Sequence, residues 1–211
     1  MSVWDERAEA YRQSPEHREG ADLDLVVEWA TGASTALDVA SGGGHVARRL
    51  REAGLDVVSS DPSPGMQADV VCRAEDLPFA DASFDVVACR LAPHHFEDVQ
   101  AGISEMARVS CGLVLVVDNL RMGEDDENAN RLRDPSHVRN YSEEEWRELF
   151  AGAGLDVEDL RTMEVTLRFQ PWLDRTGTSA EDGDRIRELI GERVEGDTMR
   201  LGRIALKGRK R

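Results

Sequence analysis

The chain has 211 residues, 40% of them hydrophobic, and a formal net charge of -16 at pH 7. This length fits one domain with a substantial core, and so large an excess of acid argues against nucleic acid or an anionic membrane as a partner. No apolar run approaches the roughly 20 residues that cross a bilayer, and the first residues do not resemble a signal peptide, so we expect a cytoplasmic protein.

The cysteines Cys72, Cys89 and Cys111 are widely spaced and odd in number. They match neither a disulfide framework nor a zinc-binding pattern. We therefore predict no metal site and expect three small buried thiols.

Apolar periodicity predicts helices and strands in alternation after residue 21. The first helix is expected over 22–30, because its apolar residues recur at i, i+3, i+4 and i+7. The remaining predicted elements, in chain order, are a strand over 35–40, a helix over 45–53, strands over 56–61, 70–74, 84–91 and 113–118, a helix between Ser142 and Gly154, a strand over 155–169, a helix over 182–194 and a strand over 198–207.

Two local features complete this pattern. Ser142 and Glu145 have the spacing of a capping box, and Gly202 interrupts the alternation of the last strand, which suggests a β-bulge. Several strands are apolar on both faces, which indicates a parallel sheet covered on each side. We predict an α/β fold: a Rossmann-like, doubly wound sheet of seven strands, mostly parallel, with helices on both faces and an antiparallel final strand paired with the strand before it.

Three consecutive glycines follow the strand over 35–40, in the stretch TALDVASGGGHVA. Such a turn lets the backbone approach a ligand closely. The G-x-G-x-x-G spacing of a dinucleotide site is absent, and Asp38 at the mouth of the turn would repel a pyrophosphate. A carboxylate there suits a cationic ligand with a ribose and an amino acid end, as in S-adenosylmethionine; a structural glycine-rich turn is the alternative.

Three acids stand at or after the ends of successive predicted strands, where such sheets bind ligands. Asp38 comes first. Asp61 could accept hydrogen bonds from both ribose hydroxyls, with Pro62 and the turn after it as an apolar edge for an adenine. Asp76 could accept a hydrogen bond from the exocyclic amine of the adenine.

The turn DVASGGG resembles the first motif of class I S-adenosylmethionine-dependent methyltransferases, D-x-G-x-G-x-G, with Ala40 replacing the first glycine and Gly42 and Gly44 in the other two places. Residues 74–98, AEDLPFADASFDVVACRLAPHHFED, are similar to the methyltransferase type 11 group, which includes ubiquinone and menaquinone biosynthesis type enzymes. The opening WDERAEAY is similar to that group's aromatic-D-x-x-A-x-x-Y, whose tyrosine is here Tyr11.

The resemblance covers about residues 4–207 and implies methyl transfer from S-adenosylmethionine to a small-molecule acceptor. Cofactor contacts are expected from Tyr11, Asp38, Ala40, Gly42, Gly44, Asp61, Pro62, Met66, Asp76, Leu77 and Arg90. The chain is then one domain over 1–211, with a helical cap (1–30), a cofactor-binding half (35–118), a lid on the substrate side (119–141) and a C-terminal half (142–211).

Two other functions remain open. One is a catalytically silent protein that binds S-adenosylmethionine or its demethylated product and acts through a partner protein. The other is a nicotinamide-dependent oxidoreductase, but this chain lacks both the glycine spacing of that class and a Tyr-x-x-x-Lys pair.

The connection from Asp61 to Asp76 departs from the resemblance, because its 14 intervening residues are too few for the usual full helix. An uncovered sheet face of this kind tends to be covered by something else. We expect either a homodimer through this face or the N-terminal segment folded across it.

The acceptor side is expected around His94 and His95, which follow the fourth predicted strand. An imidazole that titrates near neutrality can take a proton from an attacking acceptor, although such a histidine often only packs or caps a helix. Further acceptor contacts are expected from Asn119, Arg133, His137, Arg139 and Tyr141. Arg133 and Arg139 suit an acidic acceptor, with surface ion pairing as the alternative.

Overall fold

In the computed structural model, the described residues form a single sheet in the order β3-β2-β1-β4-β5-β8-β6, and β7 pairs with β8. The description covers residues 3–211, except for the side chains of residues 3, 6, 15 and 16. The strands are β1 (Thr35–Val39), β2 (Asp56–Asp61), β3 (Val70–Val71), β4 (Phe84–Arg90), β5 (Ser110–Asn119), β6 (Leu155–Arg168), β7 (Val194–Glu195) and β8 (Thr198–Lys210).

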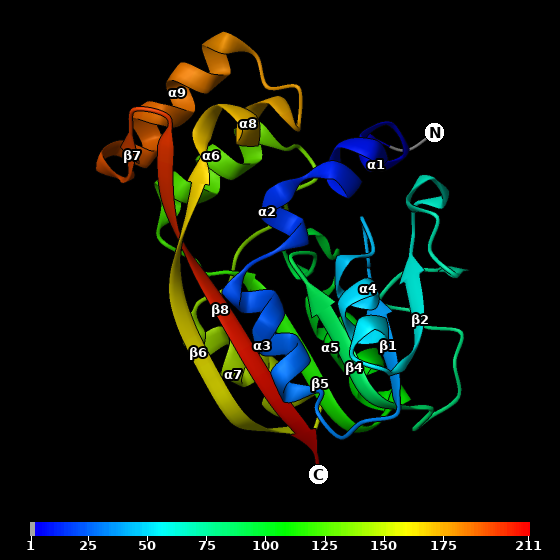
Figure 1. Cartoon of the computed structure of the whole chain (residues 1–211). Coiled ribbons are helices and arrows are strands. Elements are labelled where there is room, and N and C mark those ends of the chain that lie inside the picture. Colours follow the sequence, from blue (N-terminus) through cyan, green and yellow to red (C-terminus); the bar gives the residue numbers. More distant parts are fainter. Residues whose placement is uncertain (1–2) are drawn as a thin grey trace.

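The strand directions confirm the predicted fold (Figure 1). Strands β1 to β5 pair in parallel, whereas β8 is antiparallel to both β5 and β6. The strand predicted over 70–74 is limited to two residues. The strand predicted over 113–118 begins earlier, at Ser110.

The helices occupy the connections between strands. They are α1 (Val3–Gln13), α2 (Pro15–Arg18), α3 (Ala21–Trp29), α4 (His45–Glu52), α5 (Val99–Val109), α6 (Glu124–Arg133), α7 (Glu143–Gly152), α8 (Phe169–Asp174) and α9 (Ala180–Ile190), with 3-10 turns η1 (Pro64–Met66), η2 (Pro93–His95) and η3 (Gly191–Arg193). The capping box at Ser142 is confirmed. The helix predicted over 182–194 is too long, because Gly191 leaves α9 with a φ of 64°.

Alternate residues of the central strands supply two hydrophobic cores, one on each face of the sheet. On one face, Leu37 and Val87 belong to a buried cluster with residues of α5 and α7. On the other face, Ala36 and Val86 belong to a cluster with residues of α3 and α4. This alternation explains why the strands are apolar on both faces in the sequence.

A third core lies beyond the sheet, in a unit that we call the cap lobe: α6, α8, α9, β7 and the adjoining ends of β6 and β8. Phe169, Trp172 and Ile186 are buried within it. Figure 1 shows the cap lobe at the same end of the molecule as α1 and α2. Residues at the carboxyl ends of the parallel strands line cavities together with residues of these two units.

Helix α1 packs against the short η1 connection. The Asp5 carboxylate accepts hydrogen bonds from the Ser63 hydroxyl at 2.6 Å and the Gly65 N–H at 2.8 Å, and Arg12 donates to the Gly65 carbonyl at 3.0 Å. A Cβ at Gly65 would lie 2.7 Å from the Asp5 Cα, so the close contact requires glycine. We expected either a homodimer or the N-terminal segment to cover the shortened connection between Asp61 and Asp76. The structure has α1, from the N-terminal segment, packed against this connection.

The expected bulge at Gly202 is wrong. Gly202 pairs regularly with Glu164, and the register of β6 and β8 shifts instead between Val157 and Asp159. A Cβ at residue 202 would lie 3.2 Å from the Leu120 Cβ, so the glycine allows the chain after β5 to pass close to β8.

The expectation of three buried thiols holds for Cys89 alone. Cys72 is half-buried, and Cys111 is exposed near the start of β5.

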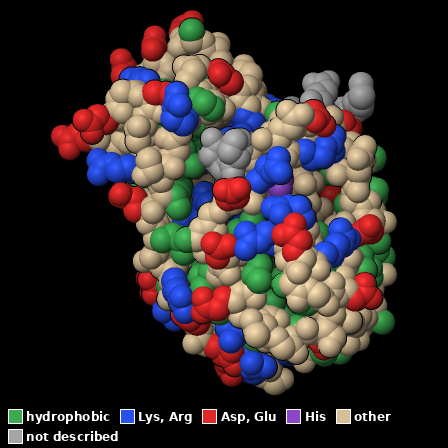
Figure 2. All heavy atoms as spheres, in the orientation of Figure 1, with side chains coloured by type: hydrophobic (Ala, Val, Ile, Leu, Met, Phe, Trp, Pro, Cys, Tyr) green, Lys and Arg blue, Asp and Glu red, His purple; other side chains and the backbone are tan. Residues whose placement is uncertain are grey.

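On the face shown in Figure 2, acidic and basic side chains are interspersed, so the net negative charge does not form one continuous field there. No helix within residues 3–211 combines the length and the apolar character needed to span a bilayer.

Candidate active site

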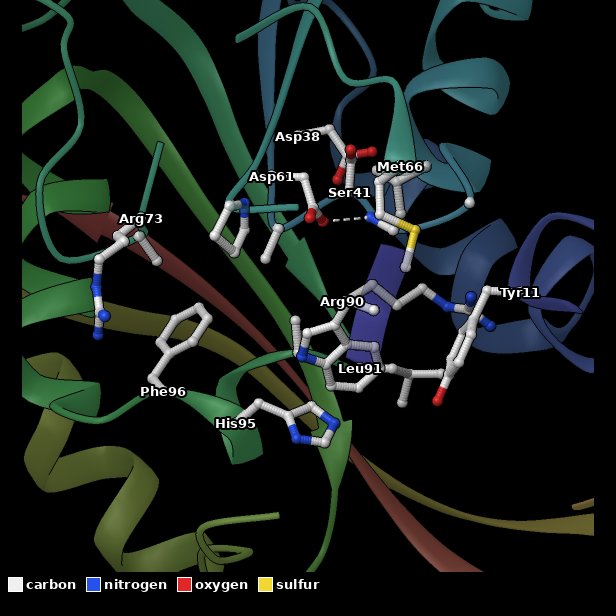
Figure 3. A pocket seen from close by; sticks show the side chains of 18 of the residues that line it. Tyr11, Asp38, Ser41, Asp61, Met66, Arg73, Arg90, Leu91, His95 and Phe96 are labelled. Atoms are coloured by element: carbon white, nitrogen blue, oxygen red, sulfur yellow. Dashed lines mark hydrogen bonds between the residues drawn. The ribbon is translucent and has the colours of Figure 1, made fainter. Parts of the chain in front are cut away.

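A cavity of about 280 Å³, which we call the main cavity, lies at the carboxyl ends of β1, β2 and β4. The turn after β1 forms one wall (Figure 3), and three of its residues have a positive φ: Ala40 (51°), Gly42 (49°) and Gly44 (73°). Ala40 and Gly42 line the cavity, whereas Gly44 is the N-cap of α4 and lies outside the lining.

Gly43, which the sequence analysis did not single out, is needed for a different reason. A Cβ there would lie 3.0 Å from the Tyr11 carbonyl oxygen and 3.1 Å from the Arg12 Cα, both backbone atoms of α1. His45 reinforces this contact, because its Nε2 donates to the same Tyr11 carbonyl at 3.1 Å. The middle one of the three consecutive glycines therefore lets α1 close over the turn.

Asp38 lines the main cavity and also holds the start of α4. Its side chain is almost wholly buried, and its Oδ2 accepts a hydrogen bond from the Ala47 N–H at 2.9 Å. Burial raises the pKa of Asp38 to about 7, and the nearby Asp61 carboxylate adds to the rise. Asp38 thus satisfies a helix N–H that would otherwise lack a partner.

Asp61 lies at the end of β2 and points into the main cavity (Figure 3). Its Oδ2 accepts from the Gly42 N–H and its Oδ1 from the Ser63 N–H, each at 2.9 Å. Burial raises the pKa of Asp61, and these two hydrogen bonds counteract the rise. Pro62 and Met66 continue the wall, as expected.

The far end of the main cavity differs from the prediction. Ala74 and Glu75 line it, with Phe96 nearby, whereas Asp76 is exposed and Leu77 is buried in the core. The chain turns just after β3, which moves the lining positions two residues toward the N-terminus.

Buried charged side chains lie at the other end of the main cavity. Arg90 donates from Nε to the Asp22 carboxylate at 2.7 Å and from Nη1 to the His17 carbonyl at 2.9 Å. Its Nη2 is buried and has no hydrogen-bond partner within the described part of the chain. Tyr11 and Trp4, both from α1, also line this cavity.

His94 forms a dyad with Asp118. The His94 Nδ1 lies 2.5 Å from the Asp118 Oδ1, and both side chains are buried. Because a carboxylate accepts, Nδ1 carries the proton and Nε2 is left for another partner. Asp118 was missed in the sequence, although it ends the apolar run LVLVVD in the same way that Asp61 ends its strand.

Two smaller cavities adjoin the dyad. One, the histidine cavity, of about 50 Å³, is lined by His94, His95, His137 and Asn140 among others. The other, the arginine cavity, of about 60 Å³, is lined by His94, Asn119, Arg133, Trp172, Arg175 and Arg203 among others. His95 lines both of these and the main cavity.

His95 itself is held in the neutral form. Burial lowers its pKa well below the usual value, and the neighbouring His94 lowers it further. Its Nδ1 donates to the Ser136 carbonyl at 3.0 Å, and its ring packs on Trp4 at 4.8 Å. His137 is engaged by Glu127, with 3.0 Å between Nε2 and Oε2.

The expected acceptor residues separate into two groups. Asn119, Arg133 and His137 line the smaller cavities. Arg139 and Tyr141 line none of the three cavities, because Arg139 is ion-paired with Glu145 and lies over the Tyr141 ring, which packs on Trp146 in the core. Arg139 therefore forms an ion pair, which was the alternative to contact with an acidic acceptor. Among the side chains that the structure describes, no three from His, Cys, Asp or Glu are grouped to hold a metal ion.

Comparison with known proteins gives consistent results. A family model described as a methyltransferase domain matches residues 37–112. The uncharacterized methyltransferase YcgJ of Bacillus subtilis is 33% identical over 208 residues, covering 87% of this chain and 81% of that protein. The demethylmenaquinone methyltransferase of Beutenbergia cavernae is 40% identical over 84 residues, 35% of each chain.

Solved structures extend this similarity to the fold. The crystal structure of YcgJ superposes with a TM-score of 0.81 at 28% identity, covering 90% of this chain and 98% of that one. A structure from Bacillus halodurans has a TM-score of 0.79 at 29% identity, covering 90% and 99%.

Proposed function

This chain belongs to the methyltransferase domain family, and from that premise we propose that it transfers a methyl group from S-adenosylmethionine to a small-molecule acceptor. The match to the demethylmenaquinone methyltransferase covers 35% of each chain, so it does not transfer that protein's acceptor to this one.

The main cavity offers groups that fit this cofactor. Asp61 would accept hydrogen bonds from the ribose hydroxyls, and the unpartnered Nη2 of Arg90 would pair with the carboxylate of the methionine end. Pro62, Met66 and Phe96 would pack on the adenine, with Ala74 and Glu75 at its edge in the place that we expected for Asp76 and Leu77. Tyr11 would close over the methionine end from α1.

The observation that carries the proposal is that the main cavity and the arginine cavity adjoin each other. The two share the lining residues Tyr11, His17, Leu91 and His95, and His94 lies on the far side of this junction. An acceptor beside His94 would therefore face the cofactor across the shared residues, and such alignment supplies most of the acceleration in a displacement reaction.

His94 is proposed as the general base. When bound, S-adenosylmethionine supplies an electrophilic methyl group, which leaves its sulfur as the acceptor atom bonds to it. The Nε2 lone pair of His94 takes the proton that the acceptor loses, and Asp118 stabilises the resulting imidazolium through Nδ1–H. The neutral His95 adds no positive charge at the junction.

Two measurements test this function. Isothermal titration compares S-adenosylmethionine with NAD, and tight binding of NAD alone would refute the proposal. Incubation with methyl-labelled S-adenosylmethionine and a metabolite extract, followed by mass spectrometry, should reveal a labelled small product. Binding without any labelled product would instead favour the catalytically silent alternative.

A further inference from the structure

The arginine cavity contains an unusual set of charges. Three arginines line it, Arg133 from α6, Arg175 after α8 and Arg203 from β8, and none of its described lining residues is acidic. The whole chain has 42 acidic and only 26 basic residues, so this concentration of cations is opposite to the overall charge.

The arginines are fixed in position rather than free on the surface. The Arg133 Nε donates to the Trp172 carbonyl at 3.0 Å, and its guanidinium lies over the Trp172 ring at 4.2 Å. The Arg203 Nη1 donates to Asp22 at 3.0 Å, and the Arg175 guanidinium lies 5.9 Å from the Tyr11 ring.

Arg203 also retains an unused donor. Its side chain is 7% exposed, and its Nε is buried without a hydrogen-bond partner among the described side chains. A buried guanidinium N–H without a partner is costly, which favours a ligand that accepts from it.

Three nearby carboxylates, those of Asp22, Asp118 and Asp134, are already engaged. Asp22 serves both Arg90 and Arg203, so one negative charge faces two positive ones. Asp118 is engaged by His94, and Asp134 by Arg7. Burial lowers the pKa of His17 well below the usual value, and the positive charges of Arg175, Arg90 and Arg203 lower it further.

We propose that the arginine cavity binds a carboxylate or phosphate group of the methyl acceptor, so that this methyltransferase acts on small anionic molecules. The inference rests on the function proposed above and specifies its acceptor. Arginine is the side chain best suited to both anions, whereas an ammonium group there would face three like charges.

The cofactor's own carboxylate is the other possible source of an anion. The structure provides a different arginine for it: Arg90 lines the main cavity and not the arginine cavity, whereas Arg133, Arg175 and Arg203 line the arginine cavity and not the main cavity. Arg90 and Arg203 donate to the same Asp22 oxygen, so Arg133 and Arg175, which do not line the main cavity, distinguish the proposed acceptor site from the cofactor site.

The test uses three probes: benzoate, phenyl phosphate and the neutral benzamide. Each is titrated calorimetrically into the full chain, with and without saturating S-adenosylhomocysteine. We expect at least one anion to bind about tenfold more tightly than benzamide in both states. Arg175→Gln and Arg133→Gln should each weaken that binding roughly tenfold and leave the affinity for S-adenosylhomocysteine nearly unchanged. The control Arg147→Gln, at an exposed ion pair with Glu143, should change neither.

Equal affinity for benzamide and both anions would overturn the inference. A second pair of results would also overturn it: Arg175→Gln no longer binds S-adenosylhomocysteine, and S-adenosylhomocysteine abolishes anion binding to the wild type. The arginine cavity would then hold the cofactor's carboxylate. If Arg133→Gln does not fold, the half-buried Arg175 decides the outcome alone. Failure of the wild-type protein to bind S-adenosylhomocysteine would refute the proposed function, and the anion titration of the free protein would still decide the anion site.

Discussion

The Nδ1 of His94 and the Oδ1 of Asp118 lie 2.5 Å apart, and both side chains are buried. His94 lies in η2, which follows β4, and Asp118 lies near the end of β5. Strands β4 and β5 are neighbours in the sheet. Asp118 also accepts from the Asn119 N–H at 2.9 Å, so its orientation is fixed from its own backbone.

The dyad leads to the first prediction. His94→Ala should lower turnover on the acceptor by about 10²–10⁴, the usual contribution of a general base, with nearly unchanged S-adenosylhomocysteine affinity. Asp118→Asn should also lower turnover, because the amide neither orients the imidazole nor stabilises its charged form. Arg147→Gln, at an exposed ion pair with Glu143, is the control. Wild-type turnover in both His94→Ala and Asp118→Asn would show that the dyad is structural.

Asp61 and Asp76 provide a matched pair for cofactor binding. Asp61→Ala should weaken S-adenosylhomocysteine binding by roughly 2–3 kcal/mol, the scale of hydrogen bonds to a charged group. Asp76→Ala removes the same carboxylate from an exposed position outside the main cavity and should leave the dissociation constant nearly unchanged. Isothermal titration decides the assignment, and the reverse result would restore Asp76 as the adenine contact.

The raised pKa of Asp38 predicts a specific dependence of stability on pH. A carboxyl that titrates near 3.8 when unfolded and at about 7 when folded stabilises the fold below pH 3.8, and this contribution is lost as the pH rises through 7. Between pH 5 and pH 8, the wild type should therefore lose roughly 2–3 kcal/mol of unfolding free energy relative to Asp38→Asn.

Urea unfolding of both proteins at the two pH values measures this difference. Asp69→Asn is the control: the hydrogen bonds from Ser59 lower the pKa of Asp69, so both its folded and unfolded forms are ionised across this range. A constant difference between the wild type and Asp38→Asn would show that Asp38 is ionised in the folded protein at pH 5.

Gly65 should determine whether α1 stays in place. In Gly65→Ala the new Cβ would meet the Asp5 Cα at 2.7 Å, so α1 must move away from η1. We expect faster tryptic cleavage after Arg7 and Arg12 and weaker cofactor binding, since Trp4 and Tyr11 line the main cavity. Gly152→Ala makes the same change in α7, where the neighbour is the flexible Gln100 side chain, and should cleave at the wild-type rate.

Local patterns in the sequence were sufficient for the sheet and for the glycine turn. The strand over 84–91 and the capping box at Ser142 depend on neighbours within a few residues, and Asp61 was recognisable because an acid ended an apolar run. Gly43, Gly65 and Arg203 were not recognisable, because their roles depend on α1 or Asp22, which lie far away in the chain. Asp76 failed as a cavity residue for the same reason: where the chain turns after β3 is set by tertiary packing, not by motif spacing.

The cap lobe has a consequence for how this fold can diversify. Its segment 169–197 leaves and re-enters the sheet at one antiparallel pair, Arg168 with Thr198, and the Phe169 N–H donates to the Asp197 carbonyl at 2.8 Å. The segment is thus an insertion at the tip of a hairpin, and it supplies Trp172 and Arg175 to the arginine cavity. Under the proposed function, exchanging it for another hairpin insertion would change the proposed acceptor side while the turn after β1 and the strands beneath it keep their sequence, although α1 contacts this segment through Arg7 and Tyr11 and would have to adapt.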